Sequence, residues 1–221
     1  MANYIFNHSL KKVEIFSECI PERKRKMNRC QWAGEDSLYI TYHDQEWGVP
    51  VYDDRLLFEF LILEGMQAGL SWITILKKRE SYRLAFDQFN AEKIAGYDNK
   101  KIRELLDNPG IVRNYLKIAA AIGNAQTFLK IQKEYGNFSR YIWQFIRNES
   151  RINHWVHLAD LPARTAESDQ MSKALKKQGF KFVGSTICYA FMQAVGMVND
   201  HQIDCFRYRE INSMIEANRH R

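Results

Sequence analysis

The chain has 221 residues, of which 46% are hydrophobic, and 32 Lys and Arg against 26 Asp and Glu give it a formal net charge of +6. This length fits a single domain of ordinary size, and the apolar content is enough for a real core, which excludes wholesale disorder. No apolar run approaches the roughly 20 residues needed to cross a bilayer, and the first residues lack the pattern of a signal peptide. We therefore expect a cytoplasmic protein without membrane contact. The positive charge favours a polyanionic partner, although many basic proteins bind no nucleic acid.

The first 28 residues are rich in basic side chains, with Lys11 and Lys12 followed by four basic residues at 23–26. We interpret residues 1–28 as a solvated and partly disordered leader. The alternative is an arm that contacts phosphates without sequence preference.

From Asp53 onward the hydrophobic pattern is helical. Asp53 is a candidate N-cap for a helix with apolar residues from Leu56 to Leu63, and Ser71 is one for a helix that starts at Trp72. Further predicted helices, separated by Gly and Pro, span residues 91–97, 98–106, 112–133, 139–147, 169–177 and 184–195. No stretch alternates with a period of two, so we expect an all-α fold without a sheet. Residues 29–205 form the predicted domain, and residues 206–221 form a charged extension that reads as a helix.

Two pairs of metal-binding side chains stand at opposite ends of the predicted domain. Cys30 lies 13 positions before His43, and His201 lies four positions before Cys205. A His and a Cys four residues apart project to one side of a helix or tight turn, and two such pairs would complete a tetrahedral structural zinc site. A single pair with this spacing also arises easily by chance, so spacing alone leaves both interpretations open. Four cysteines in a reducing compartment favour thiols or metal ligands over disulfides.

Three segments are highly distinctive: RCQWA with YITYHDQEWGVP at 29–50, LEGMQAGLSWITILKKR at 63–79, and KKQGFKFVGSTICYAFMQAVGMVNDH at 176–201. Together they resemble the DNA-3-methyladenine glycosylase I family of the helix-hairpin-helix glycosylase superfamily. The resemblance runs from about Arg29 to Cys205. It implies a helix-hairpin-helix DNA glycosylase architecture. It also implies a monofunctional, monomeric repair enzyme that flips 3-methyladenine out of alkylated double-stranded DNA and hydrolyses its glycosidic bond, leaving an abasic site.

The resemblance also implies one structural zinc ion, held by Cys30, His43, His201 and Cys205. With all four positions occupied by protein, such a site has no open position for an activated water, so its role is to join the ends of the domain. Cys19 and Cys188 do not match the ligand positions, and we interpret them as a leader thiol and a core thiol.

A glycosylase needs aromatic faces to hold the flipped base and polar groups to recognise its edge. The resemblance assigns stacking to Trp72 and Trp32, whereas Trp47 stays balanced between stacking and core packing. A methylated base is cationic while it is attached to the sugar, which favours an electron-rich ring face. Tyr42 matches the tyrosine that contacts the base edge. Trp143 and Trp155 lie outside the distinctive segments, and we expect them in the core.

Glu64 is the candidate catalytic residue. It stands within an apolar run, so a helix that buries its neighbours carries it inward, although a surface glutamate is the alternative. The resemblance matches Glu64 to the carboxylate that binds the methylated adenine. Alkylation at N3 already makes the base a good leaving group, so we rank recognition first, electrostatic stabilisation second and general base third. Asp200 directly precedes a zinc ligand and is not assigned a catalytic role, and no lysine stands where a Schiff-base nucleophile is expected.

For DNA contact, the segment 179–184 resembles the superfamily's hairpin, although a plain helix-turn-helix joint fits the local pattern equally well. The residues expected at the phosphates are Lys181, Gly184, Ser185 and Thr186. Gly69 and Leu70, between two predicted helices, form the expected wedge that enters the base stack. A second glycine turn at 108–113 is expected to pack, with phosphate contact through Arg113 or Lys117.

Two rival functions accompany this prediction. One is a zinc-stapled module that binds damaged DNA without cutting it, and the other is a purely structural helical protein whose tryptophans form the core. The sequence departs from the family pattern only at its ends, where the leader is longer and the segment after Cys205 reads as a charged helix.

Overall fold

The structure is a computed structural model that describes residues 27–219; the basic leader up to residue 26, with Cys19, lies outside this range. It confirms the mainly helical prediction. The α-helices of the described part are α1 Ser37–Gln45, α2 Asp54–Gln67, α3 Trp72–Ala85, α4 Ala91–Ala95, α5 Asn99–Asp107, α6 Tyr115–Tyr135, α7 Phe138–Trp143, α8 Ala166–Gln178, α9 Ser185–Ala194 and α10 Phe206–Arg219. Short 3-10 turns lie at Gln31–Ala33, Asp87–Phe89, Gln144–Ile146 and Leu158–Asp160. None of the helices in this range is long and apolar enough to span a membrane.

Two features differ from the sequence prediction. Helix α1 was not expected, because only Tyr42 and His43 of its nine residues are buried and they leave no apolar stripe to read. The helix is instead specified by its cap: Asp36 accepts hydrogen bonds from the backbone N–H groups that open it. The absence of a sheet was also wrong, because β1 (Arg151–Ile152) pairs in parallel with β2 (Val198–Asn199). Strands of two residues are too short to show an alternating pattern.

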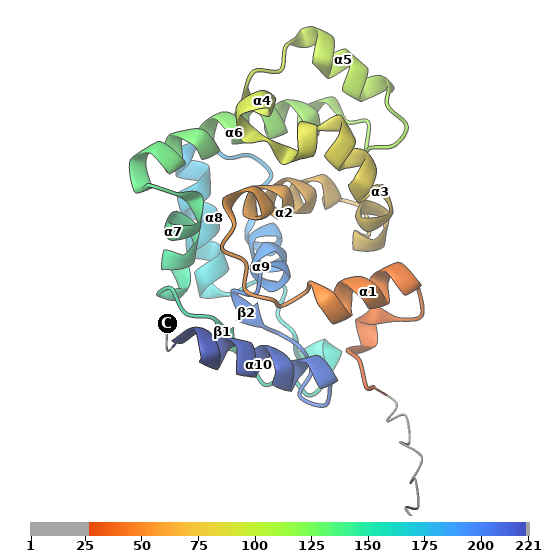
Figure 1. Ribbon diagram of the computed structural model, residues 1–221, viewed down its shortest axis with the longest axis vertical. Helices are drawn as coiled ribbons and strands as arrows, with labels where there is room; N and C mark the ends of the chain where they lie inside the picture. Colours follow the sequence, from red (N-terminus) through yellow and green to blue (C-terminus); the bar gives the residue numbers. More distant parts are fainter. Residues whose placement is uncertain (1–26, 220–221) are drawn as a thin grey trace, which may run out of the picture.

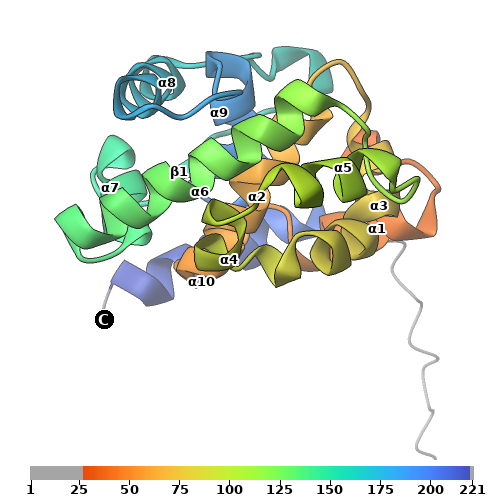
Figure 2. The ribbon, with the colours of Figure 1, turned by 90° about the horizontal axis from the view of Figure 1, so that it is seen from above.

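Helix α2 occupies the centre of the molecule and contacts α3, α6, α7 and α9 (Figures 1 and 2). As predicted, Asp53 caps it, accepting a hydrogen bond from the backbone N–H of Leu56 at 2.8 Å. Its residues are buried without interruption from Leu57 to Met66. Ser71 stands at the N-cap position of α3 as predicted, but its hydroxyl bonds to that of Thr74 instead of capping the backbone.

The buried carboxylate of Glu59 is neutralised on α2 by two arginines from α3. Arg79 Nε lies 2.6 Å and Arg83 Nη2 2.7 Å from Glu59 Oε1. Arg79 also pairs with Glu46 at the end of α1, at 2.6 Å. A buried charge is tolerated when it is paired and hydrogen-bonded. This network therefore joins three helices and leaves no uncompensated charge at Glu59.

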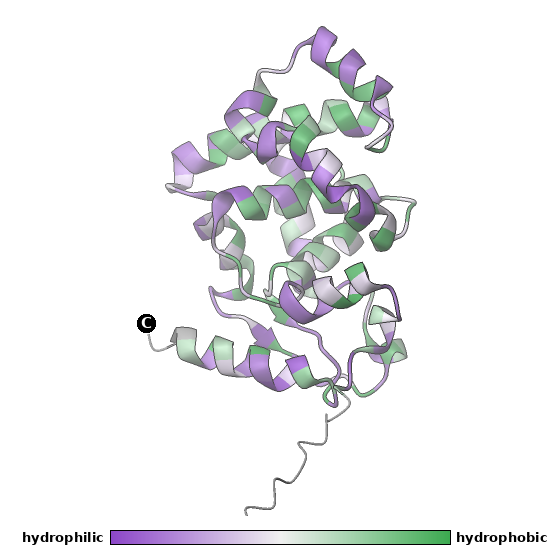
Figure 3. Cartoon of the chain, turned by 45° about the vertical axis from the view of Figure 1, so that its right-hand side comes forward, coloured by the Kyte–Doolittle hydropathy of each residue, from purple (hydrophilic) through white to green (hydrophobic). Residues whose placement is uncertain are grey.

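The first described residues lie beside the start of α10. The backbone N–H of Phe206 donates to the carbonyl of Asn28 at 2.9 Å, at the point where α10 begins. Helix α10 buries Ile211 and Ile215, and the side chain of Asn199 binds it through Asn212 at 2.7 Å. Its hydrophobic and hydrophilic residues alternate along the ribbon, whereas α5 is mostly hydrophilic and buries Leu105 in the core (Figure 3).

Gly196 forms a tight joint between the end of α9 and the segment after α1. Its φ is +69°, and an added Cβ would lie 2.4 Å from both Pro50 N and Val49 C. Real Cβ atoms essentially never approach backbone atoms so closely. Gly196 is therefore required by backbone conformation and by space at once.

We expect Gly196→Ala to lower the free energy of unfolding by more than about 2 kcal/mol, because both strain and overlap oppose the new methyl group. Gly123→Ala is the matched control: Gly123 lies inside α6 with nothing within 4 Å of an added Cβ. That change should leave stability equal or raise it by up to about 1 kcal/mol. Urea unfolding of the two variants checks this, and equal stabilities would contradict it.

Candidate functional site

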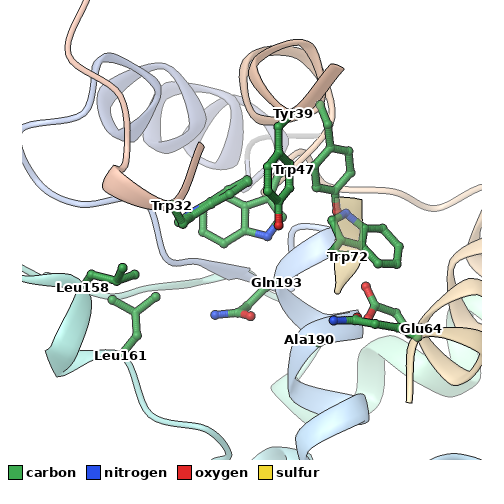
Figure 4. A pocket seen from close by; sticks show the side chains of 11 residues that line it. Trp32, Tyr39, Trp47, Glu64, Trp72, Leu158, Leu161, Ala190 and Gln193 are labelled. Atoms are coloured by element: carbon green, nitrogen blue, oxygen red, sulfur yellow. The ribbon is translucent and has the colours of Figure 1, made fainter. Parts of the chain in front are cut away.

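A cavity of about 210 Å³ opens between α1, α2, α3 and α9. It is smaller than the roughly 300–1,000 Å³ of pockets for drug-sized ligands, so it suits a compact molecule. All five residues predicted to bind a base come together here. The lining residues are Trp32, Tyr39, Tyr42, Trp47, Glu64, Gln67, Trp72, Leu158, Leu161, Ala190 and Gln193. Figure 4 shows Trp72 and Glu64 on one side of the cavity and Leu158 and Leu161 on the other.

The aromatic side chains support one another around the cavity. Trp32 meets Trp47 edge-on with ring centroids 4.9 Å apart, and Tyr42 meets Trp72 at 5.6 Å. These contacts hold the rings in fixed positions before any ligand enters. The indole nitrogen of Trp72 is buried and makes no hydrogen bond within the described part of the chain. Trp72 therefore offers a donor as well as an aromatic face.

Glu64 presents an unpaired carboxylate to this cavity. Its residue is 4% exposed, so the prediction that α2 carries it inward is confirmed. Burial raises the pKa of Glu64 from its ordinary value of 4.5 to about 8, and burial together with the charge of Glu64 raises the pKa of Tyr42 well above its ordinary range. Glu59, one turn and a half earlier on α2, has two arginine partners, whereas no residue of 27–219 pairs with Glu64. A buried carboxylate without a partner is typical of a functional site.

Sequence reasoning missed six residues of the lining. Gln67 follows Glu64 by three positions on the same helix, so helical spacing places it on the same face and was a usable signal. Gln193 and Ala190 share that spacing on α9. Tyr39 lies on the unpredicted helix α1. Leu158 and Leu161 come from an irregular segment in which no periodicity marks them.

Asp200 is close to this lining but is enclosed by donors. Oδ1 accepts from Asn153 Nδ2 at 2.6 Å and from the indole N–H of Trp155 at 2.8 Å. Oδ2 accepts from the hydroxyl of Tyr189 and from Gln193 Nε2, each at 2.7 Å. A carboxylate that accepts four hydrogen bonds is occupied, which agrees with leaving Asp200 out of the catalytic residues. Its contact with Gln193 fixes the amide that lines the cavity.

The four predicted metal ligands form one buried cluster. The ligand atoms of Cys30, His43, His201 and Cys205 all lie within 4.8 Å of one another. Cys205 Sγ lies 3.4 Å from His43 Nε2, and Cys30 Sγ lies 3.4 Å from His201 Nδ1. The hydrogen bond between the two thiols lowers the pKa of Cys205 and raises that of Cys30. This cluster could hold a metal ion.

The outward nitrogens of both histidines are also engaged. His43 Nδ1 lies 2.8 Å from a carboxylate oxygen of Asp44, which in turn pairs with Arg29 at 2.7 Å. His201 Nε2 lies 3.1 Å from the carbonyl of Trp47. Partners on the far side of a histidine ring fix its tautomer and aim the other nitrogen at the metal. The ring of Trp47 lines the cavity while its carbonyl orients His201, so one residue joins the two sites.

The remaining tryptophans and thiol lie outside both sites. Trp143 is buried in the core, as predicted, and its indole N–H donates to the carbonyl of Val51 at 3.0 Å. Trp155 is half-buried against Asp200 and does not line the cavity. Cys188 is fully buried, and burial raises its pKa to about 12, as fits a core thiol.

The residues predicted to contact DNA fall in two turns. The wedge turn, residues 68–71, joins α2 to α3. In it Gly69 has a φ of +79° and nothing within 4 Å of an added Cβ, and Leu70 is 41% exposed. The hairpin segment, residues 179–184, joins α8 to α9. Lys181 and Thr186 are exposed and Ser185 is half-exposed, while Gly184 occupies the N-cap position without a side-chain cap.

Lys117 was named as a possible phosphate contact, and this prediction is wrong. Its side chain is buried, and Nζ donates to the carbonyls of Met66 at 2.8 Å and Ala68 at 2.7 Å. Nothing in the sequence marked this lysine as different from its exposed neighbour Arg113, because both stand near the start of the same helix.

Comparison with known proteins gives a consistent family match. A model of the methyladenine glycosylase family matches residues 32–208. The chain is 50% identical over 182 residues to DNA-3-methyladenine glycosylase 1 of Escherichia coli (strain K12), covering 82% of this chain and 97% of that protein. It is 50% identical over 177 residues to DNA-3-methyladenine glycosylase of Haemophilus influenzae, covering 80% and 96%.

Solved structures agree with these relatives. A crystal structure of 3-methyladenine DNA glycosylase I superposes with a TM-score of 0.80 at 51% identity, covering 81% of this chain and 98% of that one. A variant of a 3-methyladenine DNA glycosylase I, crystallised in complex with 3-methyladenine, superposes with a TM-score of 0.79 at 39% identity, covering 81% and 97%.

We expect Glu64→Gln to become more stable relative to the wild type as the pH rises from 4.5 to 8. Over this range the folded protein keeps the Glu64 proton while the unfolded chain releases it, so wild-type stability falls with rising pH. The amide has no proton to release, and the gap should widen by up to roughly 4–5 kcal/mol. Urea unfolding at both pH values checks this, with Glu216→Gln, exposed on α10, as the control. A difference that does not change with pH would contradict the unpaired state of Glu64.

Proposed function

The chain belongs to the methyladenine glycosylase family, and from that premise we propose that it is a DNA repair enzyme that excises 3-methyladenine from alkylated double-stranded DNA. The observation that carries this proposal is the buried, unpaired carboxylate of Glu64 in a cavity walled by Trp32, Trp47 and Trp72. A methylated adenine is flat and carries positive charge while it is attached to DNA. Such a molecule needs aromatic faces and an anion, and the cavity supplies both.

Several side chains of the cavity have defined tasks in the proposed function. Trp72 and Trp32 stack on the flipped base, and the free indole N–H of Trp72 is available to an acceptor on it. Tyr42 contacts the base edge through its hydroxyl, which is protonated at neutral pH and whose pKa burial raises further. Trp47 completes the wall and the amide of Gln193 is held by Asp200.

Glu64 acts first in recognition. In the free protein its raised pKa keeps it largely protonated at neutral pH, and a cationic base beside it favours the ionised form. The ionised carboxylate then stabilises positive charge on the base and on the oxocarbenium-like sugar, which is the second role. Activation of water is the third. The cavity lining formed by the described residues includes no lysine that could form a Schiff base, so the proposed reaction is hydrolytic and leaves an abasic site.

The two turns described above supply the grip on DNA in a helix-hairpin-helix arrangement. The hairpin segment places Lys181, Ser185 and Thr186 beside the free N–H groups at the start of α9, a combination suited to a phosphate. The wedge turn follows directly on the lining residue Gln67 and exposes Leu70. An apolar side chain at that position suits the gap that a flipped base leaves. One monomer contains the cavity and both turns.

The cysteine and histidine cluster fits a single structural zinc ion. At ordinary Zn–N and Zn–S distances and a tetrahedral angle, a nitrogen and a sulfur ligand stand roughly 3.5 Å apart. The two cross-pairs measured here stand 3.4 Å apart, and Cys205 Sγ lies 3.6 Å from His201 Nδ1. When bound, the metal would join the two ends of the domain at residues 29–205. With four protein ligands it would have no open position for an activated water, so the reaction would take place in the cavity.

Incubation with methylated duplex DNA should release 3-methyladenine and hardly any 7-methylguanine, measured by chromatography of the freed bases. Glu64→Ala should slow release by about a hundredfold, because it removes a preorganised charge. Trp72→Ala should weaken base binding by about tenfold or more, the scale of one stacking contact, and Trp72→Phe should recover part of it.

A folded, metal-loaded protein that binds abasic-site DNA but releases no base would instead support the rival DNA-damage-binding module. Absence of both DNA binding and fluorescence quenching by 3-methyladenine would support a purely structural protein.

Cys205→Ala should lose the metal and destabilise the fold by at least roughly 3 kcal/mol, because metal binding is coupled to folding. Cys188→Ala is the matched control, since Cys188 is equally buried but stands outside the cluster. Inductively coupled plasma mass spectrometry measures the metal content, and thermal unfolding measures the stability. A Cys205→Ala protein that retains one zinc per chain would show that the ligands are wrongly assigned.

A further inference from the structure

We propose that helix α6 is a frame that holds the wedge turn and the hairpin segment at a fixed separation, with Lys117 and Asn124 as its positioning residues. The inference rests on the DNA-binding roles proposed above for these two turns. It assigns a function to two buried polar side chains that neither line the cavity nor reach the metal cluster.

Lys117 holds the wedge turn. Its Nζ donates to the carbonyls of Met66 and Ala68, at the end of α2, where the last carbonyls of a helix have no partner within the helix. A cation is favourable at this end of the helix dipole. Lysine is rarely buried, and burial lowers the pKa of Lys117. The contact ends one residue before Gly69, so the ammonium group fixes the point from which the exposed Leu70 projects.

Asn124 holds the hairpin segment. Its Oδ1 accepts from the backbone N–H of Lys181 at 2.8 Å, and its Nδ2 donates to the carbonyl of the same residue at 3.0 Å. This pair of bonds engages both backbone polar groups of one residue in the turn. The next residue, Phe182, has a φ of +56°, which is uncommon for a bulky side chain. A backbone in that conformation persists when its surroundings hold it there.

Lys117 and Asn124 lie on the same face of α6. A separation of seven residues corresponds to about 10 Å along the axis and only about 20° around it. Across this face α2 and the hairpin segment meet directly, since a Cβ added to Gly65 would lie 3.2 Å from Phe182 Cβ. The void that these residues enclose together with their neighbours on α2 and α6 is about 10 Å³, at or below the size that holds one water. The joint is therefore closely packed, with Lys117 and Asn124 at its two ends.

Such a joint matters because the two turns must engage the same duplex at once. The hairpin segment holds a phosphate while the wedge enters the stack, and a displacement of about 1 Å far from the chemistry can slow a reaction about a hundredfold. Because neither Lys117 nor Asn124 touches the cavity, disruption of the frame should impair action on DNA while leaving the binding of the free base unchanged.

The test compares Lys117→Met and Asn124→Leu with Lys130→Met, which removes an exposed lysine from the same helix. Three quantities are measured: fluorescence quenching by free 3-methyladenine, affinity for a duplex with an abasic-site analogue, and single-turnover excision from methylated duplex. We expect both frame variants to lose about tenfold or more in duplex affinity or excision while free-base affinity stays within about twofold. Lys117→Arg, which keeps donors for both carbonyls, should recover most of the loss, and Lys130→Met should behave as the wild type.

Folded frame variants with normal duplex affinity and excision would overturn the proposal. So would a parallel loss of free-base affinity, which would indicate general damage to the fold. If Lys117→Met fails to fold, Lys117→Gln, which keeps one donor group, takes its place in the same measurements. A wild-type protein that neither binds the duplex nor releases base would contradict the proposed function itself, and the two failures are thereby distinguished.

Discussion

Burial of α2 from Leu57 to Met66 is the constraint on which the rest of the structure depends. A helix enclosed from Leu57 to Met66 must place any carboxylate in the interior, and this one carries two. Glu59 receives Arg79 and Arg83 and becomes the joint between α1, α2 and α3. Glu64 receives no partner within residues 27–219 and keeps its proton to about pH 8. Burial of α2 thus has two consequences. At Glu59 it creates an ion-pair network that joins the helices, and at Glu64 it maintains an unpaired, energetically unfavourable carboxyl group that a ligand can contact.

The cavity and the cluster of cysteines and histidines are two distinct sites that share one residue. Trp47 contributes its ring to the cavity wall, and its carbonyl accepts from the outer nitrogen of His201. The same ring lies edge-on to His201 at 4.6 Å and stacks on His43 at 6.4 Å. Displacement of either histidine would therefore move a wall of the cavity. The Cys/His cluster thereby contributes to the order of the cavity.

The helical class, the cap at Asp53, the inward position of Glu64 and the grouping of the cysteines and histidines were predictable, because each depends on local pattern or on a distinctive motif. Helix α1 was not, since its specification lies in one capping aspartate and it has no apolar stripe. Leu158 and Leu161 reach the cavity from an irregular segment, and only the tertiary fold brings them there. Lys117 was misjudged because a basic residue near a helix start is ordinarily solvated, and its burial depends on carbonyls about 50 positions earlier.

The cluster joins side chains that are 162 to 171 positions apart in the chain. A bond that closes so long a loop removes conformational entropy from the unfolded chain, on the order of 4–5 kcal/mol in the chain-entropy model. Cys30 and His43 leave the ribosome early, whereas His201 and Cys205 are synthesised after almost every other element has begun to fold. A metal ion held there is bound with four ligands only once synthesis of the domain is complete. Metal uptake would therefore follow synthesis of His201 and Cys205, and products truncated before residue 201 would be left without this stabilisation and open to proteolysis.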